Sequence, residues 1–242
     1  MTTAITTGEA SGSGFRRRSY RDPVTGYLVL VTSPRTDPPL WESYLAGATA
    51  SYRAHGVEKA LDLESMQDGR STSLLFVALD DDGKVIGGVR SQGPYTDADQ
   101  AHAVVEWADH PSQSAVRDMV AERLADGVVE SKAAWVADDC PGRRDLVACL
   151  SRVPLHAATL FGARFALGTS AEHTLVMWRN AGAEVADEID PTPYPDDRYR
   201  TVLIWWDRWA PSPAMAERER LAAAEESAQM LEPVVPAQAD GR

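Results

Sequence analysis

The segment from residue 138 to residue 144, DDCPGRR, combines turn-forming residues with two arginines. It follows a short apolar run, residues 133–137, which is typical of a buried strand that ends abruptly. It precedes a helical pattern that begins near Arg143 and continues to Leu160. A helix N-terminus presents unpaired N–H groups and the positive end of a dipole, and arginines raise the local potential. The turn is therefore suited to bind an anion.

Cys140 lies in the same turn and offers a second kind of chemistry. A thiol at a helix N-terminus beside arginines would have a lowered pKa and could act as a nucleophile. The sequence places no histidine to partner it, so we favour a thiol without a catalytic role. With Cys149 it makes only two cysteines, too few for a disulfide framework, and we expect both to be reduced.

His102, Glu106 and His110 are spaced by four residues, which would place them on one face of a strand or a helix. One hypothesis is a metal site. The neighbouring apolar residues Val104, Val105 and Trp107 indicate a partly buried element instead, and histidines in such elements usually satisfy local hydrogen bonds. We therefore expect no metal here.

The elements that must position these residues follow from periodicity and turn signals. An acidic, glycine-ended turn at residues 80–83 predicts a β-hairpin. Pro154 would kink the long helix that begins near Arg143. The strands are expected at residues 27–32, 74–79, 84–90, 131–137, 164–168, 183–189 and 200–206, and the helices at 38–55, 57–66, 112–126, 143–160 and 171–181.

The composition excludes several classes of function. The chain has 242 residues, a formal charge of -12 and a pI near 4.8, so nucleic acid and anionic membrane surfaces would repel it. No apolar run approaches the length of a membrane span, about 18 residues, and the N-terminus lacks an export signal. We expect a cytoplasmic protein.

One domain accounts for most of the chain. Residues 1–13 are small and polar and Arg16–Arg18 is a basic end, so we expect residues 1–18 to be disordered. Residues 19–210 would form a single domain. Residues 211–242 would be an acidic tail, helical or disordered, which packs on the body, packs on a partner or frays.

Over residues 25–207 the order of strands and helices resembles the GNAT acyltransferase superfamily. The resemblance implies an α/β (α+β) fold with a mixed, mostly antiparallel, twisted sheet of about seven strands flanked by helices. It also implies that the turn after the fourth strand holds the pyrophosphate of coenzyme A. The residues implied in cofactor binding are Cys140, Gly142, Arg143, Arg144 and Asp145.

The segment from Trp178 to Ala183 is similar to the family's Tyr-x-x-x-Gly-Phe ending of a helix. In many members that tyrosine protonates the leaving thiolate. Trp178 stands there in this chain, and an indole N–H is too weak an acid for that role. The resemblance leaves Trp178 as a substrate-binding residue and requires another proton source.

A narrower resemblance is to the autoinducer synthases and long-chain N-acyl amino acid synthases. Those proteins have an acidic segment, then Gly-x-Val-x-Gly-x-x-Arg, then a glutamate that opens the fourth strand. Here the matching pieces are the acidic residues of 62–68, the hairpin strand ending in Arg90, and Glu130, with Lys132 where an arginine is usual. The resemblance implies that Glu130 assists removal of the amine proton and that Arg90 binds substrate. Glu106 is our second candidate for the base.

These observations predict an N-acyltransferase that moves an acyl group from acyl-CoA or acyl carrier protein to a small-molecule amine. Such a reaction needs both reactants held together, a base, and dipoles at the carbonyl oxygen. The alternative is a GNAT-shaped binding or scaffold protein that has lost catalysis. A homodimer is left open.

Overall fold

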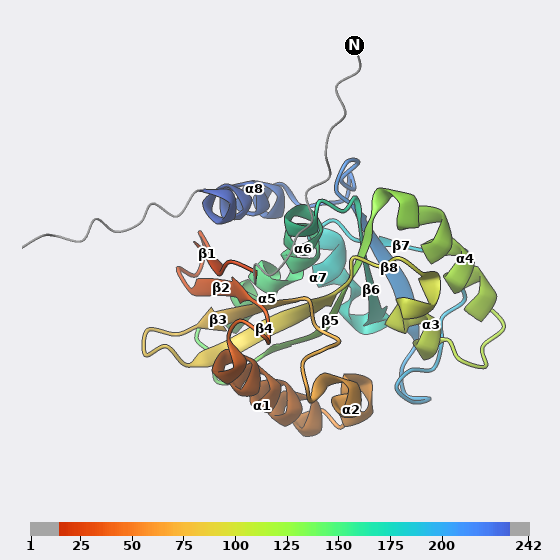
Figure 1. The fold of residues 1–242 in the computed structure, drawn as a ribbon, viewed down its shortest axis with the longest axis horizontal. Coiled ribbons are helices and arrows are strands. Elements are labelled where there is room, and N and C mark those ends of the chain that lie inside the picture. The colour runs from red at the N-terminus through yellow and green to blue at the C-terminus, as the bar shows by residue number, and fades with distance from the viewer. Residues whose placement is uncertain (1–14, 233–242) are drawn as a thin grey trace, which may run out of the picture.

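The computed structural model describes residues 15–232, which fold around an eight-stranded sheet with helices on both faces (Figure 1). The sheet order is β1-β2-β3-β4-β5-β6-β8-β7. The strands are β1 (Arg18–Arg21), β2 (Leu28–Thr32), β3 (Leu74–Leu79), β4 (Val85–Gln92), β5 (Val128–Val136), β6 (Phe165–Ala171), β7 (Glu184–Val185) and β8 (Thr201–Asp207). The helices are α1 (Pro38–Ala54), α2 (Leu63–Met66), α3 (His102–Glu106), α4 (Gln113–Arg123), α5 (Arg143–Ser151), α6 (Val153–Phe161), α7 (Leu175–Asn180) and α8 (Glu217–Leu231).

Two layers of helices cover the sheet. In Figure 1, α1 and α2 lie below it and α5 to α8 above it. The β3–β4 hairpin shows the alternation behind this arrangement, because Phe76 and Ile86 join the core under α5 and α6 while Val77 and Val85 join the core under α1. The predicted hairpin and the predicted mixed, mostly antiparallel fold are confirmed.

The sheet opens at its one parallel pair. Strands β5 and β6 pair only where Val128–Glu130 meets Phe165–Leu167. Beyond those residues β5 continues to Val136 and β6 to Ala171, each hydrogen-bonded to its outer neighbour instead. The two strands therefore splay apart and leave a gap in the middle of the sheet.

The prediction of a single continuous helix at residues 143–160 is wrong. The structure has two helices, α5 and α6, which are separated at Arg152. Pro154 lies in the first turn of α6, where a backbone N–H has no partner within the helix and its loss costs little. The helix expected at residues 171–181 is also shorter, since α7 begins only at Leu175. The strand expected at residues 183–189 is reduced to the two residues of β7.

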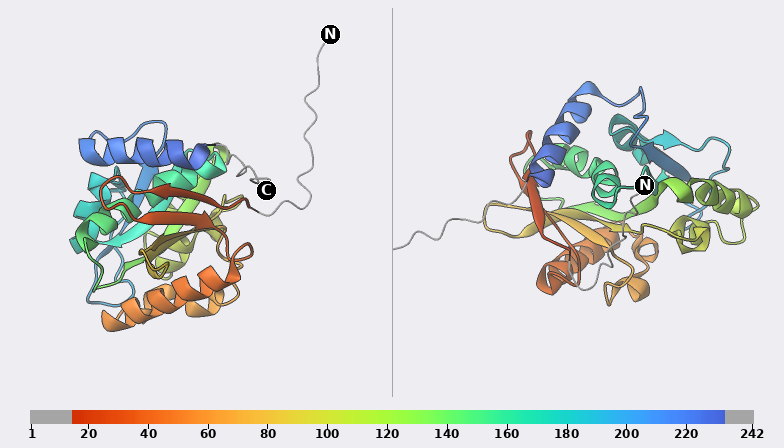
Figure 2. Two further views of the ribbon diagram at one scale, coloured as in Figure 1. Left: turned by 90° about the vertical axis from the view of Figure 1, so that its left-hand side faces the viewer. Right: turned by 45° about the horizontal axis from the view of Figure 1, so that its top comes forward.

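The two ends of the described chain pack together. Arg18 begins β1, so the basic residues 16–18 lead directly into the sheet. The Arg21 N–H donates to Gln229 Oε1 at 2.7 Å and Arg18 Nη1 donates to the Met230 carbonyl at 2.6 Å, so α8 covers the edge of β1 (Figure 2). The tail helix thus packs on the body, while the rest of the disorder predicted at the termini concerns residues 1–14 and 233–242, which lie outside the described part.

The buried side chain of Arg152 connects α8 to the rest of the protein. The Arg152 guanidinium donates to Glu226 of α8 and, at 2.7 Å, to Asp22, and it also pairs with Glu219. His156 contacts Glu226 at 2.8 Å. We call these five residues the Arg152 cluster; all are nearly inaccessible to solvent.

None of the helices between residues 15 and 232 has the length and apolar character needed to cross a membrane.

Candidate active site

The gap between β5 and β6 holds a cavity of about 480 Å³. One end is apolar and is lined from β4, β5, α5 and β8 by Val89, Val136, Leu150, Ile204 and Trp206. The other end is polar and is lined by Tyr52, Glu106, Lys132 and Tyr194. The wall includes side chains from both faces of the sheet, so the cavity connects the α5–α7 side with the α1 side.

Strand β5 bulges where it borders the cavity. Its register with β4 shifts between Gly88 and Arg90, and Ala133 has a φ of 52°. The hydroxyl of Tyr44 in α1 donates to the Ala133 carbonyl at 2.7 Å, and the Tyr52 hydroxyl donates to the Ala134 carbonyl at 3.4 Å. Two tyrosines of α1 therefore hold the irregular backbone in place.

Helix α1 can approach β5 this closely because of Gly47. A Cβ atom at that position would lie 2.1 Å from the Trp135 ring. The rings of Tyr44 and Trp135 pack beside this contact, with centroids 6.3 Å apart. Trp41 and Tyr44 of α1 are therefore core residues.

Three ionisable side chains meet at the polar end. Lys132 Nζ lies 2.5 Å from Glu106 Oε1 and 2.5 Å from His102 Nδ1, and that Nδ1 lies 2.9 Å from Glu106 Oε1. We call them the Glu106 cluster. Burial acts to raise the pKa of the Glu106 carboxyl, but Lys132 and His102 outweigh it and lower the pKa to about 2. Glu106 is therefore held as a carboxylate.

Some buried polar atoms in and beside this cluster lack a hydrogen-bond partner in the described chain. Glu106 Oε2 is buried and has no hydrogen-bond partner within residues 15–232. The same holds for Nε and Nη2 of Arg90, whose Nη1 donates to Ser71 and Thr72. Arg90 is fully buried beside β5 and does not line the cavity. Its predicted contact with substrate stays a prediction.

Glu130 lies next to the Glu106 cluster but has a different environment. Its carboxylate accepts from the Tyr95 hydroxyl at 2.6 Å and from the backbone N–H groups of His102 at 2.8 Å and Ala103 at 3.0 Å. It is fully buried, and the cavity wall does not include it. Glu130 thus holds the start of α3 in position, and its role as a base stays a prediction.

His110 does not join His102 and Glu106. It lies in the turn after α3, where its Nδ1 accepts from the Ser112 N–H at 3.2 Å. Within the described residues, three potential metal ligands come together at Asp22, Cys149 and Glu226 instead. There the Arg152 guanidinium already lies between the two carboxylates, at 2.7 and 2.5 Å.

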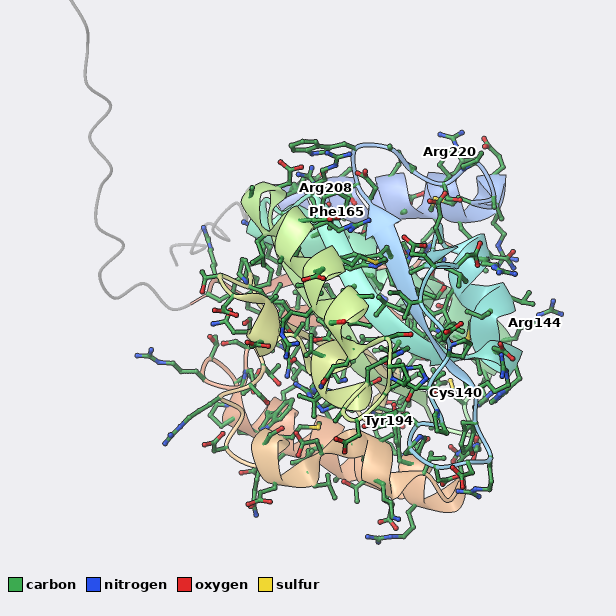
Figure 3. The ribbon with its side chains drawn as sticks, turned by 90° about the vertical axis from the view of Figure 1, so that its right-hand side faces the viewer. Cys140, Arg144, Phe165, Tyr194, Arg208 and Arg220 are labelled. Atoms are coloured by element: carbon green, nitrogen blue, oxygen red, sulfur yellow. The ribbon has the colours of Figure 1, made fainter. Side chains whose placement is uncertain are left out.

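The predicted anion-binding turn leads to the other side of the cavity. Gly142 precedes α5 in a left-handed conformation, with a φ of 66°. Arg143 lines the cavity and pairs with Asp138 at 3.4 Å. Arg144 extends away from the body (Figure 3), and Asp145 is paired with Arg218 of α8 at 2.6 Å. Of the two arginines, only Arg143 faces the cavity.

The expected low pKa of Cys140 is wrong. Cys140 is buried, with its Sγ 3.3 Å from the Pro141 carbonyl and 3.9 Å from the Tyr27 hydroxyl. Burial raises the pKa of this thiol, with Asp139 acting in the same direction, and the neighbouring Arg143 and Tyr27 do not compensate. The thiol is therefore poorly suited to act as a nucleophile.

Trp178 of α7 lines the cavity, and its role in substrate binding stays a prediction. Its ring packs edge to face against Trp206, with centroids 5.8 Å apart. Tyr52 and Tyr194 also line the cavity and were not anticipated. Tyr52 carried only a helix-packing signal, and Tyr194 lies among prolines in a loop (Figure 3) that Arg198 ties to the Gly56 carbonyl at 2.7 Å.

Comparison with solved structures identifies the fold. The protein is similar to FeeM, an N-acyl amino acid synthase from uncultured soil microbes, with 12% identity, 76% of this chain and 93% of that chain covered, and a TM-score of 0.55. It is also similar to BjaI, a CoA-dependent acyl-homoserine lactone synthase, with 15% identity, 82% and 89% covered, and a TM-score of 0.52. The protein therefore shares the fold of these proteins, and this is the GNAT fold that its sequence predicts.

Sequence comparison identifies the family. No family model matches the chain. The uncharacterized protein Rv1356c of Mycobacterium tuberculosis is 47% identical over 180 residues, which cover 74% of this chain and 68% of that protein. The uncharacterized protein Mb1391c of Mycobacterium bovis matches to the same extent. The chain belongs to the family of these mycobacterial proteins.

Proposed function

We propose that the protein is an N-acyltransferase that moves an acyl group from a coenzyme A thioester to a small-molecule amine. The observation that carries the proposal is the cavity between β5 and β6, which joins the start of α5 on one side of the sheet to the Glu106 cluster on the other. A thioester and an amine that enter from opposite sides would meet at the β5 bulge. Holding the two reactants in this way supplies much of the rate enhancement of such a transfer.

The α5 side suits the thioester. The first turn of α5 and the Arg143 side chain offer N–H groups and positive charge for phosphate groups. The apolar end of the cavity, with Leu150 and Trp206 in its wall, offers a surface for the acyl group. Coenzyme A presents both kinds of group on one flexible arm, so one ligand would satisfy both parts of the wall.

The α1 side suits the amine. Glu106 is held as a carboxylate, lines the cavity and keeps Oε2 without a partner in the described chain, so it can accept a hydrogen bond from an ammonium group. The hydroxyls of Tyr52 and Tyr194 border the same space; burial raises the pKa of Tyr52 to about 12 and raises that of Tyr194 as well. Both hydroxyls therefore remain protonated at neutral pH.

Calorimetry with coenzyme A and acyl-CoA tests the donor side. Arg143→Glu should weaken binding by about 10- to 100-fold, the effect of losing a hydrogen bond to a charged group, about 1.5–3 kcal/mol. Arg144→Glu is the matched control, because Arg144 makes the same charge change outside the cavity, and its effect should be smaller. An absence of binding by the parent protein, or equal effects of the two variants, would argue against this site.

Thiol release in the presence of an amine panel tests the reaction itself. Acyl-CoA and acyl carrier protein would be compared as donors with each amine, and we expect turnover with acyl-CoA. Turnover only with the carrier protein would correct the donor and retain the reaction.

The second candidate is a binding or scaffold protein that uses the same cavity without turnover. Trp178 favours it, because Trp178 stands where the family has its proton-donating tyrosine. Binding of acyl-CoA without transfer to any amine would support this candidate.

A further inference from the structure

We propose that Gly168 determines which acyl groups the site accepts: its missing side chain leaves room in the cavity for an aliphatic chain longer than acetyl. This specificity rests on the proposed function and names the class of its donor, the coenzyme A thioesters of aliphatic acids. Gly168 lies in β6, is buried and lines the cavity.

Gly168 lies where the sheet opens. The parallel pairing of β5 and β6 ends with Glu130 and Leu167, so Ser131 and Gly168 are the next residues of the two strands, and both line the cavity. Gly168 lies opposite Ile204 of β8, and directly opposed residues of an antiparallel pair share one face of the sheet. A side chain at Gly168 would therefore point to the α5 side, where Ile204 belongs to the apolar wall.

The backbone does not require a glycine at this position. The φ of Gly168 is outside the left-handed region, and β6 pairs with β8 from Phe165 to Ala171 without a shift of register. A glycine in a regular strand has no side chain to pack and weakens the strand, and it often marks a place where another group approaches closely. Gly168 is therefore best explained by a group that comes close to it.

The backbone of the neighbouring strands does not supply that group. Three glycines lie inside the strands of residues 15–232, and packing explains the other two. A Cβ atom at Gly87 or Gly88 would lie 2.9 or 2.5 Å from a carbonyl oxygen of a neighbouring strand, which is too close for any side chain. At Gly168 the nearest such oxygen is that of Ser131, at 3.7 Å, an ordinary van der Waals distance.

The two side chains beside Gly168 belong to the apolar wall of the cavity. A Cβ atom would lie 3.3 Å from Cζ3 of Trp206 and 3.6 Å from Cγ1 of Ile204. An alanine would need the Trp206 ring to move by only a few tenths of an ångström. A larger side chain would extend into the cavity that these residues line. We therefore infer that the group for which glycine makes room is a ligand in the cavity.

An aliphatic chain matches this surface. The side chains around this end of the cavity include Val89, Leu150, Ile204 and Trp206, which offer apolar contact and no charge. The one polar group among them, Trp206 Nε1, already donates to the Ala181 carbonyl at 3.1 Å. An acetyl group has a single methyl group to place there, whereas a longer acyl chain would fill the space.

Binding of acyl-CoA as a function of chain length tests the proposal without turnover. The probes are coenzyme A and the saturated straight-chain acyl-CoAs from acetyl to dodecanoyl, measured by calorimetry with the parent protein. We expect the affinity to rise from acetyl to the longest chain that the cavity holds and then to fall. A parent protein that prefers acetyl-CoA, or that shows no dependence on chain length, would overturn the proposal and leave acyl transfer standing.

Gly168→Ala adds one methyl group to the wall of this space. Affinity and kcat/KM for the longest accepted acyl-CoA should fall by about 10–200-fold relative to a shorter one, the effect of one methylene in an apolar pocket. Affinity for coenzyme A itself should not change. The Tm should change little, because alanine in a regular strand offsets the shift of the Trp206 ring. A lower Tm with an unchanged chain-length profile would show that Gly168 serves core packing and would reject the proposal.

Ile204→Val is the matched compensating variant. Valine removes one methylene from the opposite side of the same space, so this variant alone should extend the preference to longer chains. When Gly168→Ala and Ile204→Val are combined, the space is restored and the parent profile should return. A double variant that keeps the profile of Gly168→Ala would show that the two residues do not border one acyl chain, and would overturn the proposal.

The outcomes separate the acyl specificity from the proposed reaction. A parent protein that binds no acyl-CoA overturns both. A chain-length preference that shifts in Gly168→Ala, without transfer to any amine, overturns the proposed reaction but supports the role of Gly168 and the acyl chain as its ligand.

Discussion

Two buried charge clusters lie within residues 15–232, and they differ in how completely their members are paired. In the Arg152 cluster, Arg152 contacts three carboxylates, and His156 takes up another oxygen of Glu226. In the Glu106 cluster, Glu106 Oε2 and two nitrogens of nearby Arg90 have no partner in the described residues. Only the Glu106 cluster borders the cavity.

This difference separates structural charge from charge that is available to a ligand. A buried charge is tolerated when its hydrogen bonds are made within the protein, as at Arg152, where the contacts join Asp22, directly after β1, to α6 and α8. A buried polar atom left unpaired beside a cavity costs stability, so a substrate that supplies its partner gains that energy on binding. Variants in the Glu106 cluster should therefore mainly lower activity, and variants in the Arg152 cluster should mainly lower stability.

Glu106→Gln should have the largest effect on activity. Gln keeps the size and a hydrogen-bond acceptor but loses the negative charge that would hold an ammonium group and accept its proton. We expect acyl transfer to fall by about 10²–10⁴-fold, measured as thiol release per mole of folded protein.

Glu130→Gln is the matched control for that variant. Glu130 accepts three hydrogen bonds that hold the start of α3, so its loss should lower the unfolding free energy, by about 1.5–3 kcal/mol for a hydrogen bond to a charged group. A folded Glu106→Gln protein with full activity, together with an inactive Glu130→Gln protein, would transfer the role of base to Glu130, as the sequence resemblance implies.

Arg152→Met should have the largest effect on stability. It leaves Asp22, Glu219 and Glu226 buried without their cation, and removal of one partner from a buried ion pair costs about 3–5 kcal/mol. Urea unfolding measures this loss, and exposure of α8 to a protease would show where it acts. Affinity for coenzyme A should persist under conditions where the variant is folded.

Arg164→Met is the control for the effect of burial. Arg164 also pairs with two carboxylates, Asp126 and Asp207, but its side chain is 29% exposed. Partly exposed pairs contribute about 0–1 kcal/mol. Equal losses of unfolding free energy in the two variants would mean that burial does not determine how much the Arg152 cluster contributes to stability.

How well the sequence predicts a feature depends on how far apart along the chain the residues that form it lie. The β3–β4 hairpin and the α1 helix follow from local patterns, and both are confirmed. The Glu106 cluster was visible only in part: the spacing of His102 and Glu106 is local, whereas Lys132 joins them from 26 residues away. Periodicity carries no signal for such a contact.

The Arg152 cluster was not anticipated at all, for the same reason. Its contact from Arg152 to Asp22 spans 130 residues and that to Glu226 spans 74. Arg152 itself lies where a continuous helix was expected, and the break there follows from how Pro154 is placed at the start of α6. Turn chemistry and helix spacing therefore predict the elements, but not the side chains that meet between them.

The smallest expected effect is on the pH dependence of stability, and it separates the two clusters again. Lys132 and His102 outweigh burial and lower the pKa of Glu106 to about 2, against about 4.3 in an unfolded chain. Between these values the unfolded state binds more protons than the folded state, so Glu106 stabilises the fold above about pH 4.3, and this contribution is lost as the pH falls toward 2. The Arg152 cluster acts in the same direction, because Arg152 and His156 outweigh burial and lower the pKa of Glu226.

Urea unfolding between about pH 2 and 5 measures this contribution. The unfolding free energy of Glu106→Gln should fall less steeply on acidification than that of the parent, and the slope that remains should include the contribution of Glu226. Glu42→Gln, at an exposed position of α1, controls for the change of a surface carboxylate. A slope in Glu106→Gln equal to that of the parent would show that Lys132 and His102 do not hold Glu106 ionised, and the amine site would lose its carboxylate.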